Sequence, residues 1–433
     1  MQTPQISYCT NVHSGTDWQA AVDNLKKYTL PVRESLCRSG EWRTGEPMGV
    51  GLWLAEPAAR HAIANQLVEK TKVWLESQNL VPFTMNGFPY GNFHQSIVKH
   101  RVYQPTWWED ERRTYTETLV TILDQLLPAG VSGSISTLPI AWGSPVPSPE
   151  QLTRAASNLC RIADYLDQLF QNTGRCIVLA IEPEPGCYLT DNSTMRSFFR
   201  EYLLSDDSQS EKRRKYLTVC HDVCHAAVMR EDQQIEFARH KAEGIRIGKV
   251  QVSSAIHVDW DAIQNDRKLE TYQQIHKFAE DRYLHQTTVQ VDNGPAKLIE
   301  DLTVLLASVS DPMSLVGNWR VHFHVPIFYD HHVGEHQRLL SGALPLPEPA
   351  SDFYGIGTTQ SEILKCLQLL EGDRTQNKEH EIAFQEAFFT GHYEIETYAW
   401  TVLPVALRQA SLVKDIAREM SYLKKLFDRI ASM

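Results

Sequence analysis

Short apolar runs alternate with amphipathic helical patterns eight times along this 433-residue chain. A strand followed by a helix, repeated in this way, is typical of a parallel sheet covered by helices. Eight such units predict an α/β protein with a closed (β/α)8 TIM barrel. The strands are expected at ISYCTN from residue 6, MGVGLWL from 48, LVPFTMNG from 80, GSISTLPI from 133, CIVLAIEP from 176, YLTVCHDV from 216, IGKVQVSS from 247 and YEIETYAW from 393.

A barrel of this kind has about 250 residues, so the chain must carry a large insertion. Most of the surplus lies between the seventh and eighth predicted strands, in residues 256–390. We expect the insertion to hold a helical hairpin, an extra strand WRVHFHVPIF at 319–328 and a Pro-rich loop at 341–355. An alternative is that residues 321–328 form the seventh barrel strand. Since no linker or repeat divides the chain, we expect a single domain over 1–433.

The charge balance argues against a nucleic-acid partner. The net charge is -11 at pH 7, whereas affinity for a phosphate backbone needs clustered Lys and Arg. The sequence shows no apolar stretch of about 18 residues and no secretory signal, so we expect a cytoplasmic protein without a membrane span. The eight cysteines lie in apolar contexts and are expected to be structural. The expected partner is a small, sugar-like metabolite, bound by a single chain or by a homo-oligomer.

Acids and histidines stand where predicted strands end. Glu182 follows the run IVLAI, Asp222 ends the run LTVCHD, and His225 comes three residues later. A charge at the tip of a buried strand costs several kcal/mol unless it is paired or bound to a metal. Because the active site of a (β/α)8 barrel lies at the C-terminal ends of the strands, we expect these residues to converge on a metal site. The simpler alternatives are a rim ion pair for Glu182 and a helix N-cap for Asp222.

Two further segments repeat this pattern. Glu394 and Glu396 share one face of the last predicted strand, where inward carboxylates need a cation or protons. His322 and His324 share one face of the extra strand, which suits two metal-facing imidazoles or one ligand and one substrate donor. Buried, hydrogen-bonded histidines are the alternative. For Glu184, two residues beyond the end of the fifth strand, an ion pair across the rim is the simpler expectation.

The loop NGFPYGNFH at 86–94 follows the third predicted strand directly. It is rich in Gly and Pro and carries three aromatic residues, so we expect it to line the mouth of the pocket. Aromatic faces there would stack on a sugar or on a flat metabolite. Asn86, Phe88, Tyr90 and His94 are therefore candidate substrate-binding residues, although such loops also simply turn the chain.

At these residues the chain resembles the xylose-isomerase-like TIM barrels, the superfamily of sugar isomerases, sugar epimerases and the related apurinic endonucleases. More narrowly, the motifs IEPEP, CHDVCH, VHFHVP and EIETYAW, with NGFPYG upstream, resemble the EboE-type metabolite traffic proteins. The resemblance to the epimerases implies metal ligands at Glu182, Asp222 and Glu396. It also implies a substrate-binding histidine at His225.

The third metal ligand departs from the epimerase pattern, because KVQVSSA puts Gln251 where the epimerases have a histidine. Either Gln251 ligates through its carbonyl oxygen, or His324 takes over, or the metal site is degenerate. An intact site would favour Mn2+ or Mg2+, with Zn2+ as a further candidate.

The resemblance implies a sugar isomerase or epimerase. Glu182 and Glu396 would exchange a proton next to a substrate carbonyl, and His225 would belong to the catalytic group. Gln251 and His322 would contact the substrate. The alternative is an EboE-type traffic or binding protein without turnover, whereas the acidic charge disfavours a nuclease.

Overall fold

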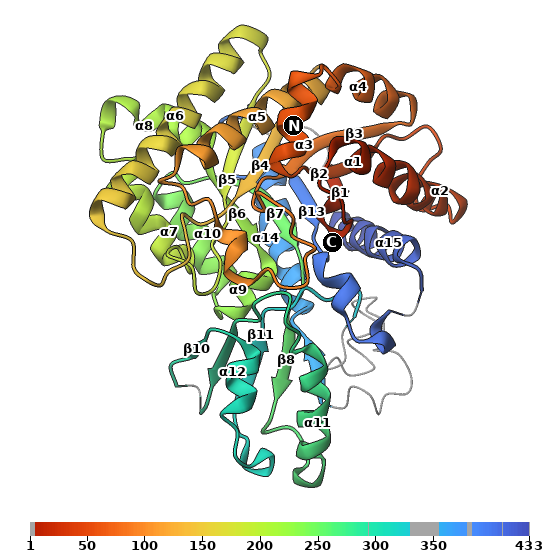
Figure 1. Ribbon diagram of the computed structural model, residues 1–433, viewed down its shortest axis with the longest axis vertical. Coiled ribbons are helices and arrows are strands. Elements are labelled where there is room, and N and C mark those ends of the chain that lie inside the picture. Colours follow the sequence, from red (N-terminus) through yellow and green to blue (C-terminus); the bar gives the residue numbers. More distant parts are fainter. Residues whose placement is uncertain (1–4, 293, 330–354, 379–382, 409, 433) are drawn as a thin grey trace.

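The computed structural model describes the chain except for residues 1–4, 293, 330–354, 379–382, 409 and 433. Eight parallel strands form the central sheet, in the order β1-β13-β7-β6-β5-β4-β3-β2. An isolated bridge between Cys9 and Gly51 joins the two outermost strands, so the sheet closes into a barrel (Figure 1). The predicted (β/α)8 fold is confirmed, and all eight predicted runs are barrel strands. These are β1 (Gln5–Tyr8), β2 (Met48–Trp53), β3 (Leu80–Asn86), β4 (Gly133–Thr137), β5 (Ile177–Ile181), β6 (Leu217–Asp222), β7 (Ile247–Val252) and β13 (His392–Ile395).

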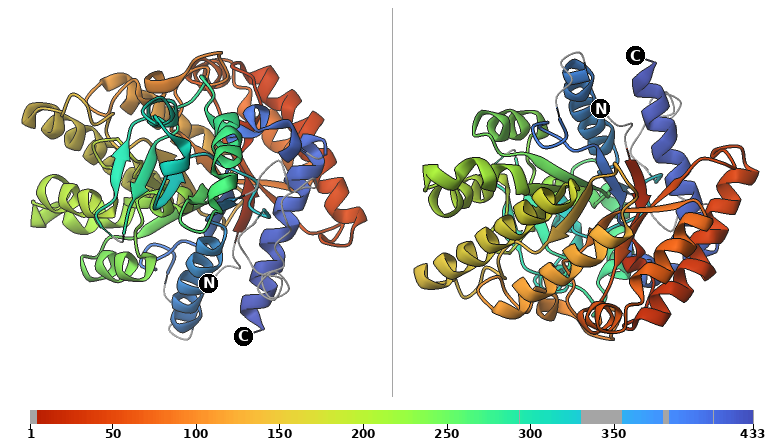
Figure 2. Two further views of the ribbon diagram at one scale, coloured as in Figure 1. Left: turned by 90° about the horizontal axis from the view of Figure 1, so that it is seen from below. Right: turned by 90° about the horizontal axis from the view of Figure 1, so that it is seen from above.

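Helices alternate with the barrel strands and form a ring around them (Figure 2). Helix α6 (Pro149–Thr173) shows how the sequence sets the ends of such a helix. Ser148 and Gln151 form a capping box, Pro149 occupies the first turn, and Gly174 ends the helix at a φ of 70°. The other helices of the ring are α1 (Trp18–Asn24), α2 (Leu30–Arg38), α3 (Glu56–Ala64), α4 (Val68–Ser77), α5 (Asp110–Leu126), α7 (Asn192–Phe198), α8 (Asp207–Tyr216), α9 (Val223–Val228), α10 (Gln233–Ala242), α14 (Ser361–Lys378) and α15 (Leu412–Ala431).

The barrel interior holds a buried ion pair. Lys249 on β7 and Glu394 on β13 are both completely buried, with the Lys249 Nζ 2.7 Å from a carboxylate oxygen. Lys249 also donates to Ser136 Oγ at 3.2 Å. Gly51 on β2 makes room for the pair, because a Cβ there would lie 1.5 Å from a Glu394 oxygen. The cation that the inward-facing Glu394 needs is therefore Lys249.

The insertion after β7 forms a second sheet, the lower lobe in Figure 1. This sheet is antiparallel, with the order β10-β9-β11-β8-β12. The predicted helical hairpin is wrong, because two strands separate the helices α11 and α12. The alternative prediction, that residues 321–328 form the seventh barrel strand, is wrong as well. The elements of the insertion are β8 (Ile256–Asp259), α11 (Lys268–Ile275), β9 (Thr287–Gln290), β10 (Lys297–Ile299), α12 (Leu302–Ala307), β11 (Asn318–Val321) and β12 (Ile356–Thr358).

The extra strand of the insertion is shorter than the sequence predicted. Strand β11 ends at Val321, so His322 and His324 lie beyond it rather than on one face of it. The expected Pro-rich loop at 341–355 falls outside the described residues except for Gly355. That the barrel and the insertion fold as a single domain stays a prediction.

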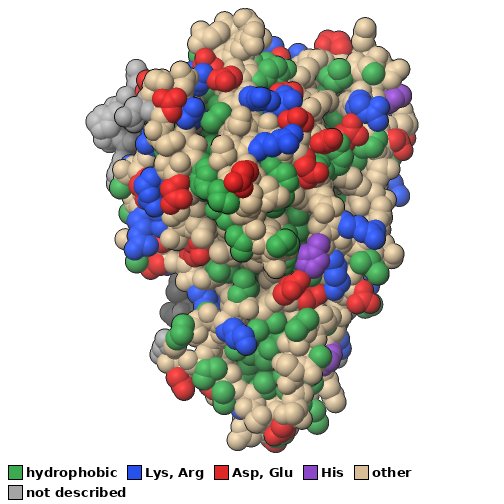
Figure 3. Space-filling view, turned by 60° about the vertical axis from the view of Figure 1, so that its left-hand side comes forward, with side chains coloured by type: hydrophobic (Ala, Val, Ile, Leu, Met, Phe, Trp, Pro, Cys, Tyr) green, Lys and Arg blue, Asp and Glu red, His purple; other side chains and the backbone are tan. Residues whose placement is uncertain are grey.

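The surface of the barrel carries both signs of charge. On the face shown in Figure 3, acidic and basic side chains are interspersed over the barrel, whereas uncharged side chains prevail over the lower lobe. Among the described residues, no helix is long and apolar enough to cross a membrane. All eight cysteines are unpaired thiols, and six of them are buried.

Candidate metal centre

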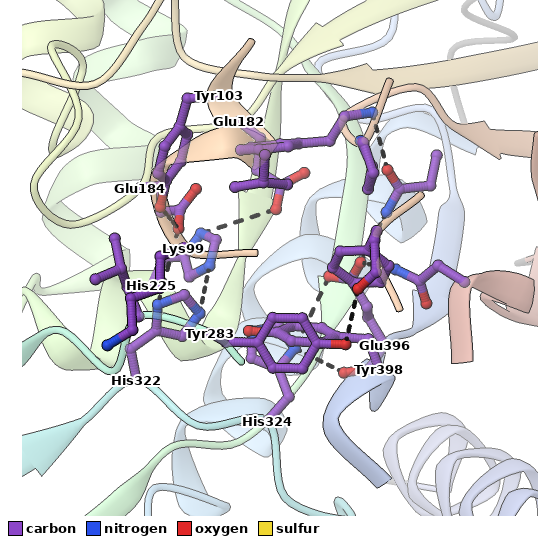
Figure 4. A pocket seen from close by; sticks show the side chains of 17 residues that line it. Lys99, Tyr103, Glu182, Glu184, His225, Tyr283, His322, His324, Glu396 and Tyr398 are labelled. Atoms are coloured by element: carbon purple, nitrogen blue, oxygen red, sulfur yellow. Dashed lines mark hydrogen bonds and ion pairs between the residues drawn. The ribbon is translucent and has the colours of Figure 1, made fainter. Parts of the chain in front are cut away.

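A pocket lies at the C-terminal ends of the barrel strands, where active sites of this fold are built. It holds about 530 Å³ of space between the side chains, part of it open to solvent. Figure 4 shows carboxylates and imidazoles from the barrel and from the insertion pointing into this space. The polar side chains of the floor are Asn11, Asn86, Glu182, Glu184, His225, His322, His324 and Glu396.

Three carboxylates meet at the base of this pocket. Glu182, Asp222 and Glu396 follow or end β5, β6 and β13, and their oxygens lie within 4.8 Å of one another. Burial, and then the charges of Glu396 and Asp222, raise the pKa of Glu182 well above its ordinary value. Burial, and then the charges of Asp222 and Glu394, do the same to the pKa of Glu396. Three acids this close need a cation or shared protons, so a divalent metal ion fits the cluster.

Asp222 and Glu396 each use one oxygen to bind the protein and leave the other to the cluster. Asp222 is the N-cap of α9, where its Oδ1 accepts from the His225 N–H at 2.9 Å and from Ser253 Oγ at 2.8 Å. Glu396 Oε1 accepts from the side-chain amides of Asn11 and Asn86, both at 2.7 Å. The N-cap that the sequence offered as an alternative is thus present, and it orients Asp222 toward the cluster.

Two carboxylate oxygens of the cluster are buried without a hydrogen-bond partner in the described part of the chain. They are Glu182 Oε2 and Asp222 Oδ2. A buried polar atom left in this way is costly, and native structures keep few of them. Because both atoms belong to residues of the carboxylate cluster, they are the donors that a bound cation would use.

His324 completes this set from the insertion. Its Nδ1 donates to the Glu396 carbonyl oxygen at 2.7 Å, which leaves the lone pair on Nε2. That Nε2 is buried, lies 3.8 Å from Asp222 Oδ2 and has no hydrogen-bond partner among the residues described. A fixed tautomer with a free Nε2 is the usual state of a metal-binding histidine. The donors are therefore carboxylate oxygens and one imidazole, a set that suits Mn2+, Mg2+ or Zn2+.

His225 and His322 form a second pair beside the carboxylates. Their Nε2 atoms lie 3.1 Å apart. His225 Nδ1 donates to the Pro183 carbonyl oxygen at 2.9 Å, and His322 Nδ1 donates to Gln286 Oε1 at 2.7 Å. The Gln286 amide is oriented by its own donation to the Pro185 carbonyl oxygen. Two neutral rings in this arrangement point their lone pairs at each other, so the pair requires a shared proton or a cation.

Glu184 lies in the pocket wall and not in the rim ion pair that the sequence favoured. Its Oε1 accepts from the Tyr103 hydroxyl at 2.7 Å and from the Gln286 amide at 3.3 Å. Burial raises the pKa of Glu184 to about 7. An oxygen of Glu184 also lies within 4.8 Å of ring nitrogens of His225 and His322. The second acid of IEPEP thus belongs to the site.

The aromatic loop after β3 contributes only part of what the sequence predicted. Asn86 and Phe88 line the pocket, as expected. Tyr90 lies outside it, and its ring packs edge-on against Tyr115 at 5.1 Å and under the Arg112 guanidinium at 5.6 Å. Tyr115 and Arg112 both belong to helix α5, so Tyr90 faces that helix and not the pocket.

His94 supports the site from behind, whereas Gln251 is buried in the barrel outside the pocket lining. His94 Nε2 donates to the Asn11 carbonyl oxygen at 2.8 Å, next to the amide that holds Glu396. Gln251 is completely buried on β7 beside Asp222 and Glu394 in the sheet register, and it is not among the residues that line the pocket. Neither side-chain amide atom of Gln251 has a hydrogen-bond partner within the described ranges.

Four site residues were missed by the sequence analysis. Asn11 lies just beyond the end of β1, as Asn86 lies at the end of β3, so the strand-end rule could have found it. Lys249 is a charged residue in the middle of a buried strand, which is itself a signal for an interior ion pair. Tyr103 and Gln286 lie in the β3–α5 connection and in the insertion, where no periodicity marks them.

Comparisons with known proteins bear on the fold alone. No protein-family model matches the sequence, and no curated protein matches it either. The solved structures that it is similar to are xylose-isomerase-like TIM barrels. L-ribulose 3-epimerase has a TM-score of 0.37 and 11% identity, over 65% of this chain and 80% of that one. The IolI protein with a bound zinc atom has a TM-score of 0.35 and 10% identity, over 57% and 73%.

A third similar structure is the family 2 AP endonuclease from Brucella melitensis. Its TM-score is 0.36 and its identity 13%, over 58% of this chain and 80% of that one. At such scores the assignment of the fold rests on the strand order of this chain and not on these matches.

Proposed function

We propose that this protein is a divalent-metal-dependent isomerase or epimerase that moves a proton next to the carbonyl of a sugar-like metabolite. The observation that carries this proposal is the buried carboxylate cluster of Glu182, Asp222 and Glu396, in which Glu182 Oε2 and Asp222 Oδ2 have no hydrogen-bond partner in the described structure. The unpartnered His324 Nε2 lies 3.8 Å from Asp222 Oδ2. Glu396 would be the fourth ligand. In this ligand set His324 is the third ligand, a position for which the sequence left both His324 and Gln251 open.

The carboxylates are also placed for proton transfer. A divalent ion held by this set would polarise a substrate carbonyl and stabilise the negative charge that develops on it. Glu182 and Glu396 reach the pocket from β5 and β13, two strands that are separated by β6 and β7 in the sheet. One of them would take a proton from the substrate carbon while the other returns it on the opposite side. Asn11 and Asn86 fix Glu396 for this role.

The two histidines beside the carboxylates would bind the substrate. His225 and His322 line the pocket with their Nε2 atoms facing each other, and both are held from behind through Nδ1. A substrate hydroxyl can donate to either nitrogen. Asn86 and Phe88 would contact the substrate from the loop after β3.

Solvent deuterium exchange tests the chemistry. Protein loaded with Mn2+ should incorporate deuterium at the carbon next to the carbonyl in one or more members of a panel of keto sugars. Glu396→Gln should abolish this exchange, and Asp222→Asn should lower the metal content measured by elemental analysis. Glu231→Gln, at a half-buried glutamate that hydrogen-bonds Asn192, is the control and should change neither. Full metal content in Asp222→Asn would contradict the proposal.

The second candidate function is an EboE-type traffic or binding protein without turnover. The observation in its favour is Gln251, which stands where the epimerases have a histidine ligand. In this case the protein would bind its metabolite and metal, yet no substrate in the panel would exchange deuterium with or without Glu396. The cytoplasmic location and a homo-oligomeric state stay predictions for either function.

A further inference from the structure

The wall above the carboxylates is almost entirely aromatic and aliphatic. Its side chains come from three distant segments: the connection after β3, the stretch of the insertion before β9, and the turn after β13. Figure 4 shows Tyr283 and Tyr398 standing over the carboxylates and imidazoles. The residues that matter here are Phe88, Phe93, Tyr103, Tyr283, Leu284 and Tyr398.

These rings pack into one unit that begins at the metal ligands. The Phe93 ring lies 5.2 Å from Tyr283 and 5.4 Å from Tyr398, and Tyr283 lies 5.0 Å from Tyr398. The Tyr398 ring in turn lies 4.7 Å from the ring of His324. Phe93 and Tyr283 belong to a buried apolar cluster apart from the main barrel core. A ligand that reaches the carboxylates is therefore enclosed by apolar surface along the rest of its length.

Three polar groups of this wall are already bound to the protein. The Tyr103 hydroxyl donates to Glu184, and the Tyr283 hydroxyl donates to the Phe93 carbonyl oxygen at 3.2 Å. Lys99 at the same wall pairs with Asp301 at 2.6 Å. A free sugar carries hydroxyls on every side, and those facing this wall would lose water without gaining partners. An apolar ring would lose nothing there and would gain contacts with the aromatic faces.

We propose that the ligand of this pocket is a hydroxycarbonyl or vicinal diol compound whose other end is an apolar, ring-containing body, rather than a free sugar. The polar end would face the carboxylates, and the body would lie against the aromatic wall that Phe93, Tyr283 and Tyr398 form. This inference rests on the proposed function for the identity of the polar end only. The apolar body follows from the wall itself.

A matched pair of chelators tests the inference on the Zn2+-loaded protein. Benzohydroxamic acid and acetohydroxamic acid chelate a metal through the same two oxygens and differ by a phenyl ring in place of a methyl group. Burial of a phenyl ring predicts that the aromatic ligand binds about 10- to 100-fold more tightly, as measured by calorimetry. Phe93→Ala should reduce that ratio several-fold while leaving acetohydroxamic acid unaffected, which also shows that the metal site is intact. Phe170→Ala, on the outer helix α6, is the control and should leave the ratio unchanged.

A second arm does not depend on a metal. In metal-free protein, 1-phenyl-1,2-ethanediol should give a saturation-transfer NMR signal that Phe93→Ala abolishes, whereas glycerol should give none. If the protein retains no metal, the proposed function fails while this arm still decides the substrate class. Similar affinities for the two hydroxamic acids, or an aromatic preference that survives in Phe93→Ala, would overturn the inference.

Discussion

Replacing Glu182 with Gln should change the stability and the metal affinity of the protein in opposite directions. Burial and the charges of Glu396 and Asp222 raise the pKa of Glu182 well above its ordinary value. The folded apoprotein therefore binds a proton at Glu182 more tightly than the unfolded chain does, where the glutamate pKa is near 4.3. The stability cost grows by about 1.4 kcal/mol per pH unit above about pH 4.3, to at most about 4 kcal/mol at pH 7. A neutral amide carries no such cost, so the variant apoprotein should be more stable by about 1 to 3 kcal/mol.

The effect on metal binding has the other sign. Removal of a second-sphere partner lowers metal affinity about 10- to 100-fold, so loss of a charged ligand should lower it at least about 100-fold, or about 3 kcal/mol. Metal at 100 times its Kd stabilises a folded protein by about 2.7 kcal/mol. Added Zn2+ should therefore raise the Tm of the wild-type protein by much more than it raises the Tm of Glu182→Gln.

Thermal unfolding of chelator-treated protein, with and without Zn2+ at pH 5 and pH 7, measures both effects. Glu236→Gln is the control, because the Glu236 carboxylate is buried and pairs with Arg196 and Arg239. That variant should lose stability under every condition. The reasoning would be refuted if metal-free Glu182→Gln were less stable than the metal-free wild type at pH 7. It would also be refuted if added Zn2+ raised the Tm of the variant as much as that of the wild type.

Three further predictions concern the fold around the site. Burial raises the pKa of Glu419 to about 8. The wild-type protein should therefore lose at most about 5 kcal/mol of stability as the pH rises from about 4.5 to 8, measured by urea titration. Glu419→Gln should flatten this pH profile. Lys249→Met leaves a buried carboxylate unpaired and should cost about 3 to 5 kcal/mol, much of it recovered in the double variant with Glu394→Leu. Gly51→Ala puts a Cβ onto Glu394 and should lower the Tm markedly, with circular dichroism as the readout.

The barrel could be predicted from the sequence because each strand and helix is encoded locally. Parallel strands buried on both faces read as apolar runs, and the polar residues that interrupt them mark the strand ends. Glu182, Asp222 and Glu396 were found in this way, and the structure brings them within 4.8 Å. The insertion could not be predicted in the same way, because its strands have three or four residues each and leave too little periodicity to distinguish them from turns.

The orientation of the site depends on contacts that sequence spacing does not encode. The position of His324 beyond β11 is set by its hydrogen bond to the Glu396 carbonyl oxygen, which joins the insertion to the last barrel strand. Lys99 and Asp301 add a second link between the barrel connection and the insertion. A cation held by Glu182, Asp222 and His324 would bridge the same two parts of the chain. Metal binding should therefore slow hydrogen exchange in the insertion as well as in the barrel, because the ion binds a ligand from each and stabilises only the state in which both are folded together.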